Sequence, residues 1–282
     1  MTQTQCCGMV AIVGKPNSGK STLTNAFVGQ KVSIVTHKPQ TTRRQIQGVA
    51  IWGDAQVVFV DTPGIFNSKG KFEEALVDSA YRALRDMDLV IILIDPGDYQ
   101  PEFLQTLKHK LKDRSHLVVI NKSDLKKEIT IEGAFVISAL QGTGLDELKE
   151  EILKYIPQHP WLYEEDQLTN ISEKLWSSEI VREKAMLCLH QEIPYELYVE
   201  CDAYGQQENG DIRMNHNIVV SAERYKPIVL GHKGSMIKKI GTEARKELEQ
   251  QLGCRVHLFL NVKATEKWKD RIHILRREGI IS

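Results

Sequence analysis

The residues best suited to chemistry lie in one short loop, Gly14 to Ser21, with the sequence GKPNSGKS. This loop matches the pattern G-x-x-x-x-G-K-[ST] at every fixed position, with an apolar run before it and a helical stretch after it. Backbone N–H groups of such a loop face phosphate, the lysine reaches the β- and γ-phosphates, and the last hydroxyl binds Mg²⁺. The alternative, a glycine-rich turn that binds nothing, fits this context poorly. The predicted phosphate-binding residues are Gly14, Lys15, Pro16, Asn17, Ser18, Gly19, Lys20, Ser21 and Thr22.

The segment Asn121-Lys122-Ser123-Asp124 predicts which base is bound. Asp124 offers two acceptor oxygens, and guanine presents N1–H and N2–H₂ side by side, whereas adenine has no such pair of donors. Asn121 and Lys122 would brace the loop. Ser138 and Ala139 follow a later apolar run, and a backbone N–H there would meet guanine O6. The pattern therefore predicts GTP and GDP as ligands.

The segment Asp61-Thr62-Pro63-Gly64-Ile65 lies between these two motifs, at the end of an apolar run. Asp61 would hold Mg²⁺ through water, and the Gly64 N–H would meet the γ-phosphate. Thr42, in the sequence TTRR, would complete the Mg²⁺ shell together with Ser21 only when the γ-phosphate is present, which is typical of a switch segment. The alternatives are a Pro-Gly turn for the first segment and an exposed polar loop for the second.

These motifs need elements that hold them at one edge of a sheet. Apolar runs predict strands at 9–13, 57–61, 89–95, 116–121 and 134–138, and amphipathic stretches predict helices at 19–28, 71–86, 102–112 and 144–155. Strands that are apolar throughout, separated by helices, predict an α/β domain with helices on both faces, here over 1–157. Prolines at 157 and 160 and acidic residues at 164–166 predict a linker over 158–172.

Together these motifs resemble the translation-factor-related class of P-loop GTPases, over about residues 8–157. The resemblance implies a mostly parallel sheet with the nucleotide at the carboxyl ends of its strands. Only 13 residues separate Asp124 from Ser138, too few for the helix that related domains place there, so this edge is expected to be shortened.

Many GTPases orient the attacking water with a glutamine directly after D-x-x-G, but Ile65 stands at that position. Intrinsic hydrolysis should therefore be slow. The chain resembles the subgroup with an apolar residue there, some of whose members use an asparagine at the position of Asn17 to bind K⁺. K⁺ assistance through Asn17 and activation by a macromolecular partner both remain open. The predicted catalytic residues are Lys20, Thr42, Gly64 and Asn17.

The C-terminal part carries the pattern G-x-x-G between two helical stretches, at 231–234. From Arg224 to Lys239 there are five basic residues and no acidic one. The order of predicted elements over 173–282 is helix, strand, strand, helix, G-x-x-G, helix, strand, which matches an α+β type II KH domain, a binder of single-stranded RNA. Two further expectations are a basic helix over 266–277 and core positions at Ile228, Val229, Met236, Ile237 and Ile240. The predicted RNA-binding residues are Lys226, Gly231, His232, Lys233, Gly234, Lys238 and Lys239.

A GTPase domain followed by one KH domain resembles a family of bacterial ribosome-assembly GTPases. The resemblance implies binding to small-subunit ribosomal RNA near its 3′ end, a role in small-subunit assembly and rRNA maturation, and a cytoplasmic monomer with loose peripheral membrane contact. Two alternatives are a GTP-dependent tRNA-modification enzyme, for which no cofactor motif is present, and a docking scaffold whose KH fold has lost RNA binding.

Composition is consistent with these expectations. The 282 residues include 37 Lys+Arg and 37 Asp+Glu, so the net charge is +0 and any attraction to RNA must come from a local patch. No apolar run reaches the length of a membrane span, and the polar start MTQTQCCG is unlike a secretory signal. The five cysteines show no metal-ligand spacing, which favours a reducing compartment.

Overall fold

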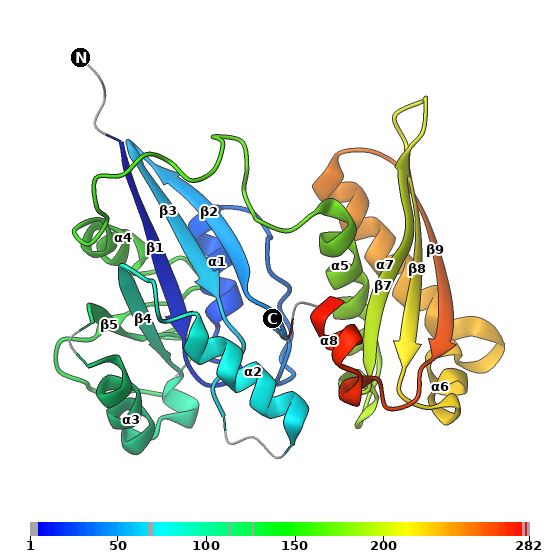
Figure 1. Cartoon of the computed structure of the whole chain (residues 1–282), viewed down its shortest axis with the longest axis horizontal. Helices are drawn as coiled ribbons and strands as arrows, with labels where there is room; N and C mark the ends of the chain where they lie inside the picture. The colour runs from blue at the N-terminus through cyan, green and yellow to red at the C-terminus, as the bar shows by residue number, and fades with distance from the viewer. Residues whose placement is uncertain (1–4, 67–69, 113, 126, 278–279, 281–282) are drawn as a thin grey trace. The chain divides into compact units, whose positions relative to one another are not determined.

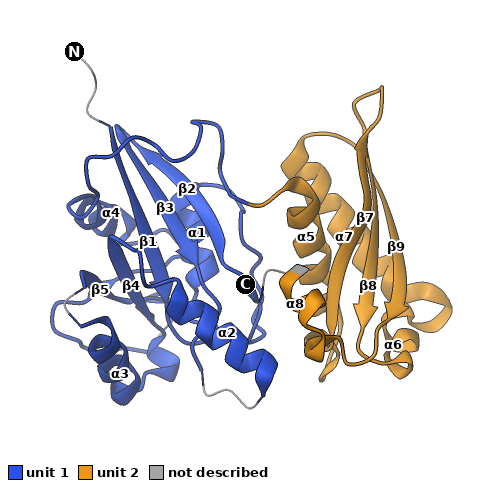
Figure 2. Cartoon of the chain, in the orientation of Figure 1, with its two compact units in different colours: residues 1–170, 278–282 blue, residues 171–277 orange. Residues whose placement is uncertain are grey.

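The computed structural model describes residues 5–66, 70–112, 114–125, 127–277 and 280 and divides the chain into two compact units (Figures 1 and 2). Unit 1 contains the residues up to Asn170 and the described C-terminal residue Ile280, and unit 2 spans Ile171–Arg277. The end of the predicted KH range, at 278–279 and 281–282, lies outside the described residues, as do 1–4, 67–69, 113 and 126 of the predicted GTPase domain.

Unit 1 is a six-stranded sheet in the order β2-β3-β1-β4-β5-β6. The strands are β1 (Cys6–Val13), β2 (Ile46–Trp52), β3 (Ala55–Asp61), β4 (Leu89–Ile94), β5 (His116–Ile120) and β6 (Phe135–Val136). All neighbouring pairs are parallel except β2 with β3. The helices are α1 (Lys20–Val28), α2 (Lys71–Arg82), α3 (Pro101–Leu111) and α4 (Leu145–Leu153). The mostly parallel sheet implied by the family resemblance is confirmed.

Alternate residues of the central strand β1 enter two different cores, one on each face of the sheet. Val10 and Ile12 pack with residues of α1 and α4, and Ala11 and Val13 pack with residues of α2 and α3. Strand side chains alternate between the two faces, so a strand that is apolar throughout must be covered on both sides. Helices on both faces follow from this pattern, as predicted.

The antiparallel strand β2 was missing from the predicted elements. Its sequence IQGVAIW contains Gln47 and Gly48, which weaken the signal of a strand. Gly48 is needed because a Cβ there would lie 2.8 Å from Val28 Cγ2 and 3.0 Å from Thr24 Cγ2 of α1. The glycine therefore allows α1 to pack closely on this edge of the sheet.

The expected shortening between Asp124 and Ser138 is present. None of the described residues from 125 to 134 is helical, and β6 has two residues where a strand over 134–138 was predicted. Other boundaries in unit 1 differ by up to four residues: α2 ends at Arg82 rather than at 86, α4 ends at Leu153 rather than at 155, and β1 begins at Cys6 rather than at 9. The sheet thus ends in a minimal strand that still pairs with β5 through Val119 and Ile120.

The predicted linker lies along the outer edge of the sheet for most of its length. The Val49 N–H of β2 donates to the Leu168 carbonyl at 2.8 Å, and Gly48 forms an antiparallel bridge with Thr169. The buried Gln56 of β3 holds the segment at Tyr163. Residues 158–170 are therefore a docked part of unit 1.

Unit 2 has helices on a three-stranded sheet in the order β7-β8-β9, with β7 and β8 antiparallel and β8 and β9 parallel. Its elements are α5 (Glu173–Cys188), β7 (Leu197–Gln206), β8 (Ile212–Val220), α6 (Lys226–Leu230), α7 (Ser235–Leu252), β9 (Val256–Ala264) and α8 (Ile272–Arg277). The predicted element order is confirmed. Val229, Ile240, Ala244 and Leu248 are buried on the helix side of the core.

Two expectations for unit 2 were wrong. Ile228 is 49% exposed rather than in the core, because α6 is a helix of five residues that buries only Val229. The basic helix over 266–277 is broken into a 3₁₀ turn at Trp268–Asp270 and the short α8. Trp268 is fully buried and donates its Nε1–H to the Glu196 carbonyl at 3.0 Å, which draws the chain inward there. Among the described residues, no helix has the length and apolar character needed to cross a membrane.

Candidate nucleotide site and nucleic-acid interface

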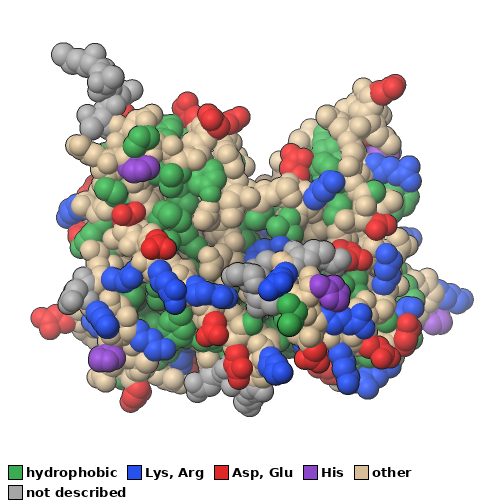
Figure 3. All heavy atoms as spheres, in the orientation of Figure 1, with side chains coloured by type: hydrophobic (Ala, Val, Ile, Leu, Met, Phe, Trp, Pro, Cys, Tyr) green, Lys and Arg blue, Asp and Glu red, His purple; other side chains and the backbone are tan. Residues whose placement is uncertain are grey.

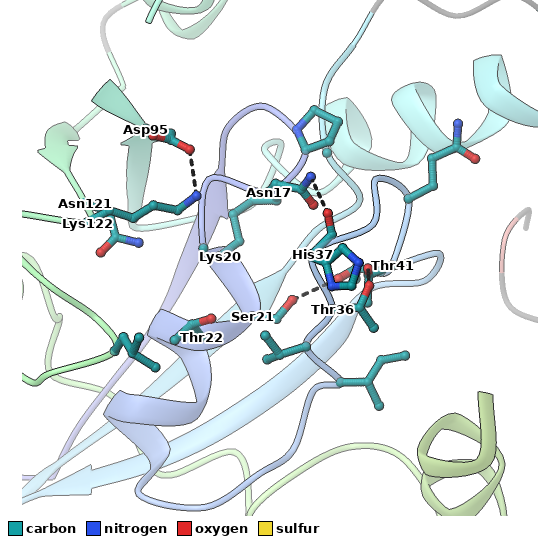
Figure 4. Close-up of a pocket in the computed structure, with 18 of the residues that line it drawn as sticks. Asn17, Lys20, Ser21, Thr22, Thr36, His37, Thr41, Asp95, Asn121 and Lys122 are labelled. Atoms are coloured by element: carbon teal, nitrogen blue, oxygen red, sulfur yellow. Dashed lines mark hydrogen bonds and ion pairs between the residues drawn. The ribbon is translucent and has the colours of Figure 1, made fainter. Parts of the chain in front are cut away.

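A cavity of ≈ 590 Å³ opens at the carboxyl ends of the unit 1 strands (Figure 4). Eleven of the predicted nucleotide residues line it, and they come from every predicted segment except Ser138-Ala139: Pro16, Asn17, Gly19, Lys20, Ser21, Thr22, Thr42, Gly64, Asn121, Lys122 and Asp124. Polar side chains from parts of the chain more than 100 residues apart therefore meet in one place.

The glycines of the phosphate loop are required by close contacts. A Cβ on Gly14 would lie 2.3 Å from the Leu93 carbonyl oxygen of β4, and one on Gly19 would lie 2.2 Å from Asn121 Nδ2. Gly19 also has a positive φ of 95°, which disfavours side chains. The loop can therefore lie against β4 and the base-recognition segment only with glycine at both positions.

Lys20 bends back over the loop that precedes it. Its Nζ donates to the Lys15 carbonyl at 2.8 Å and to the Gly14 carbonyl at 3.3 Å. Burial lowers the pKa of its ammonium to about 8, although the Asp61 carboxylate acts to raise it. A buried cation with neutral carbonyls as its hydrogen-bond partners is well suited to an anionic ligand, since triphosphate oxygens would compensate its lost hydration.

Two of the three predicted Mg²⁺ residues, Ser21 and Thr42, contact the carboxylate of the third, Asp61. The Ser21 hydroxyl donates to Asp61 Oδ2 at 2.7 Å and lies 2.9 Å from the Thr42 hydroxyl, whose oxygen is 3.4 Å from the same carboxylate oxygen. Asp61 Oδ1 is buried without a hydrogen-bond partner among the described residues, and burial raises the pKa of the carboxyl. Two hydroxyls and a carboxylate with an unmatched oxygen are the hard donors that Mg²⁺ prefers, so these residues fit the ion.

Asn17 and Gly64 link the phosphate loop to the two segments predicted to sense the γ-phosphate. Asn17, at φ 63°, donates its Nδ2–H to the His37 carbonyl at 2.9 Å. Gly64 packs on the loop so closely that a Cβ would lie 2.8 Å from the Pro16 nitrogen, and the Ile65 N–H donates to the Gly14 carbonyl. The Ile65 side chain is buried in the core rather than in the cavity, so it cannot orient water.

The base-recognition segment is braced as predicted. Asn121 donates to the Ser18 carbonyl at 2.9 Å and accepts the Ala139 N–H at 2.9 Å, which ties three loops together. Lys122 pairs with Asp95 at 2.6 Å (Figure 4). The exposed Asp124 accepts the Ser138 hydroxyl at 2.5 Å, so its carboxylate is oriented at the cavity wall.

The remaining predicted residues lie behind the cavity wall. The N–H groups of Ser138 and Ala139 donate to the Thr143 carbonyl and to Asn121, and Leu140 lines the cavity in their place. Lys15 turns its side chain away, to Asp98 at 3.1 Å. The others that do not line the cavity are Gly14, Ser18, Asp61, Thr62, Pro63 and Ile65.

Sequence reasoning missed several residues of the wall, mainly in the segment between α1 and β2: Ile34, Val35, Thr36, His37 and Gln40, together with Asp95 and Leu125. That segment has no periodic pattern, and its only signal was its position between the phosphate loop and Asp61. Asp95 carried a clearer signal, since it directly follows the apolar run of β4.

In unit 2 the G-x-x-G pattern forms a sharp turn between α6 and α7. Gly231 has φ 72°, and a Cβ there would lie 2.7 Å from the Met236 nitrogen, whereas Gly234 has φ 77° and open space around it. Lys233 also has a positive φ, of 49°. Gly231 thus closes the turn, while Gly234 leaves room for a backbone from outside to approach the start of α7.

The predicted basic residues surround this turn on its exposed side. His232, Lys233, Lys238 and Lys239 are exposed. Lys226 is half-buried and pairs with Glu223 at 3.1 Å, an acid that lies just outside the segment counted in the sequence. Four of these five side chains are therefore presented to solvent beside the G-x-x-G turn.

Comparison with known proteins decides the family. A family model described as "50S ribosome-binding GTPase" matches residues 9–122, and a KH domain model matches residues 192–269. GTPase Era of Brucella suis biovar 1 is 40% identical over 294 residues, covering 99% of this chain and 94% of that protein. The chain belongs to the Era family of GTPases. Era of Dinoroseobacter shibae is 41% identical over 280 residues, covering 93% of this chain and 91% of that protein.

Two solved Era structures have the same fold as this Era-family chain. A crystal structure of Era in complex with MgGDPNP and nucleotides 1506–1542 of 16S ribosomal RNA has a TM-score of 0.92 and 36% identity, covering 99% of this chain and 100% of that one. A variant of Aquifex aeolicus Era bound to GDP·AlF4⁻ gives the same values. The predicted fold class is confirmed, and the chain is a GTPase.

Proposed function

We propose that this chain is a GTP-hydrolysing switch that binds the 3′ end of small-subunit ribosomal RNA through its KH domain and acts in small-subunit assembly and rRNA maturation. The main support is that one chain combines the cavity around Lys20 and Asp124 with an exposed G-x-x-G turn at 231–234. An Era structure with MgGDPNP and 16S rRNA nucleotides has the same fold over nearly the full chain.

GTP recognition is divided between the two ends of the cavity. At the base end, the Asp124 carboxylate would accept guanine N1–H and N2–H, held in place by the Ser138 hydroxyl. At the phosphate end, Lys20 would leave the loop carbonyls for the β- and γ-phosphates. With the Ser138 and Ala139 N–H groups engaged, the Leu140 N–H is our candidate for guanine O6.

Ser21 and Thr42 would ligate Mg²⁺ directly, and Asp61 would hold it through water. When bound, the ion neutralises charge on the β- and γ-phosphate oxygens. The present contacts of the two hydroxyls with Asp61 keep them within reach of one another. Thr42 thereby couples its segment to the triphosphate, as expected of a switch.

Hydrolysis should be slow without help because Ile65 is buried and apolar. The Gly64 N–H would contact the γ-phosphate, next to the loop against which it packs. Two sources of help remain open: K⁺ bound with Asn17, whose side chain is already fixed on the His37 carbonyl, or an activating partner.

RNA would bind beside the G-x-x-G turn, with Gly231, His232, Lys233 and Gly234 at the backbone and Lys226, Lys238 and Lys239 around it. We expect a cytoplasmic monomer, as the family resemblance implies. Loose membrane contact rests on the family resemblance alone, and the broken 266–277 segment, with Trp268 buried, gives it little support.

The test is binding of a labelled RNA that copies the 3′ end of small-subunit rRNA. We expect tighter binding with a non-hydrolysable GTP analogue than with GDP, and loss of binding in Gly231→Asp/Gly234→Asp with GTP hydrolysis intact. Equal affinity in both nucleotide states would refute coupling. RNA binding unchanged in the double variant would favour the docking scaffold instead. The protein is also incubated with tRNA and GTP. The appearance of modified bases in that tRNA would favour the modification enzyme.

A further inference from the structure

A second cavity, of ≈ 390 Å³, opens in unit 1 where α2 and α3 end, and it shares no lining residue with the nucleotide cavity. It is lined by Tyr81, Leu84, Arg85, Lys110, Leu111 and Arg114. Three of these six side chains are cationic and none is acidic. Figure 3 shows Lys and Arg side chains gathered around the end of α2 on the face toward the viewer.

Two of the three cations are held in position by the protein. Arg114 donates through Nη1 to the carbonyls of Leu84 and Arg85, just after α2. The Lys110 Nζ lies 3.7 Å from the centroid of the Tyr81 ring. Cations that are already oriented lose less conformational freedom on binding than free lysine side chains, so this cavity is better prepared for an anion than an ordinary basic surface.

The surrounding residues add to the positive potential. Arg82, Lys108 and Lys112 are exposed close by in the sequence. Three acids lie nearby in the sequence: Asp86 and Asp88 are exposed and do not line the cavity, and Asp113 lies outside the described residues, so the basic side chains of this region still outnumber the acidic ones. Basic side chains concentrated in this way attract phosphates in spite of a net charge of zero for the whole chain.

We propose that this basic cavity, formed by Tyr81, Arg85, Lys110 and Arg114, is a second RNA contact that binds phosphodiester groups of the rRNA whose 3′ end occupies the KH domain. The inference rests on the function proposed above. RNA held by the KH domain is present at a high effective concentration, so a weak phosphate site in unit 1 adds affinity without needing to bind RNA alone. Guanidinium and ammonium groups at fixed positions match phosphate oxygens of one backbone.

The test compares Arg85→Glu/Lys110→Glu with Lys149→Glu/Lys154→Glu, a control in α4 and at its C-cap with the same change in charge. Arg114 is left intact because its hydrogen bonds to the Leu84 and Arg85 carbonyls hold the chain just after α2. Three ligands are used: a short 3′-end rRNA fragment, protein-free full-length small-subunit rRNA, and whole small subunits, each titrated between 50 and 200 mM KCl. Arg85→Gln/Lys110→Gln repeats the test if the charge reversal impairs folding, and GTP hydrolysis reports on the fold.

We expect the cavity variant to bind the short fragment like the unaltered chain. Its affinity for full-length rRNA and for whole subunits should fall ~10-fold, with a salt slope smaller by about two phosphate contacts. Equal behaviour of the cavity variant and the control would overturn the proposal. A loss seen with subunits but not with protein-free rRNA would assign the cavity to an acidic protein and also overturn it. Failure of the unaltered chain to bind the short fragment would instead contradict the proposed function itself.

Discussion

The buried carboxamide of Gln56 forms two hydrogen bonds with the backbone of Tyr163, accepting its N–H at 3.0 Å and donating to its carbonyl at 2.9 Å. Gln56 Oε1 also accepts the Leu162 N–H at 2.9 Å. A strand residue thus acts as a backbone partner for the segment that leads toward unit 2. Because β3 ends at Asp61, the same strand carries both this anchor and a predicted Mg²⁺ ligand.

Replacing Gln56 with leucine should release this segment from the sheet. The change leaves backbone groups of Leu162 and Tyr163 without partners, so unit 1 should lose about 1–3 kcal/mol of unfolding free energy in urea. We also expect a smaller difference in RNA affinity between the GTP-analogue and GDP states. Tyr163→Phe, which removes only the hydroxyl contact with Gln47, serves as the control. Unchanged stability would show that the segment docks without this anchor.

Asp124→Ala should abolish the preference for guanine. The alanine has no acceptor for N1–H and N2–H, so GTP affinity should fall by about 100-fold while ATP affinity stays low, as measured by displacement of a fluorescent nucleotide. Ser138→Ala keeps the carboxylate but removes the hydrogen bond that orients it, together with the one that the hydroxyl accepts from the Gln141 N–H, and should cost about tenfold or less. A variant that kept full discrimination against ATP would contradict the assigned role.

Asn17→Ala separates the two explanations for hydrolysis. If Asn17 helps to bind K⁺, turnover of the unaltered chain should be at least several-fold faster in KCl than in NaCl at equal ionic strength, and the variant should lose this difference. Thr22→Ser, a conservative change in the same loop, is the control. Equal rates in the two salts would leave activation by a partner as the remaining explanation.

The pKa of about 8 for Lys20 predicts that GTP binding weakens in alkaline solution. Below pH 8 the ammonium is charged before the nucleotide arrives, and bound phosphates raise its pKa further. As pH rises through 8, the Lys20 amine loses its proton, and it must take up a proton again when GTP binds. GTP affinity should therefore fall by up to about tenfold per pH unit between pH 8 and 9.5. Lys20→Arg keeps its charge throughout, so its affinity should fall less over this range, where the guanine N1 proton is also lost. Identical profiles for the two proteins would show that Lys20 is charged at all these pH values.

Acid should destabilise unit 2 through His216. Burial lowers the pKa of its imidazole to about 4, below the 6.5 of an unfolded chain, and its Nε2 lies 3.0 Å from the Ser177 hydroxyl. As pH falls, His216 is therefore protonated in the unfolded chain before it is protonated in the folded chain. Stability present above pH 6.5 should be lost progressively as pH falls toward 4, by up to about 3 kcal/mol. Hydrogen exchange of β8 amides at pH 7 and 5 measures this loss, and His216→Gln should show a smaller one.

The nucleotide-binding segments could be predicted from the sequence because their chemistry requires fixed residue types at short spacings. GKPNSGKS, Asp61 to Gly64 and Asn121 to Asp124 each sit within a few residues of a strand end. Parallel strands bring their carboxyl ends to one edge of a sheet, so the alternation of apolar runs and helices was enough to predict that these segments meet. The G-x-x-G turn and the order of elements in unit 2 were readable for the same reason.

Only the tertiary structure decided features that depend on contacts between distant residues. The strand β2 was hidden because Gly48 is chosen for contact with Val28 and Thr24 rather than for strand propensity. The docking of 158–170 depends on Gln56, a polar residue whose buried position no local pattern reveals. The break before α8 follows from the burial of Trp268. Sequence determines local chemistry and periodicity, whereas these positions are set by how closely separate elements can pack and by which buried polar groups must find partners.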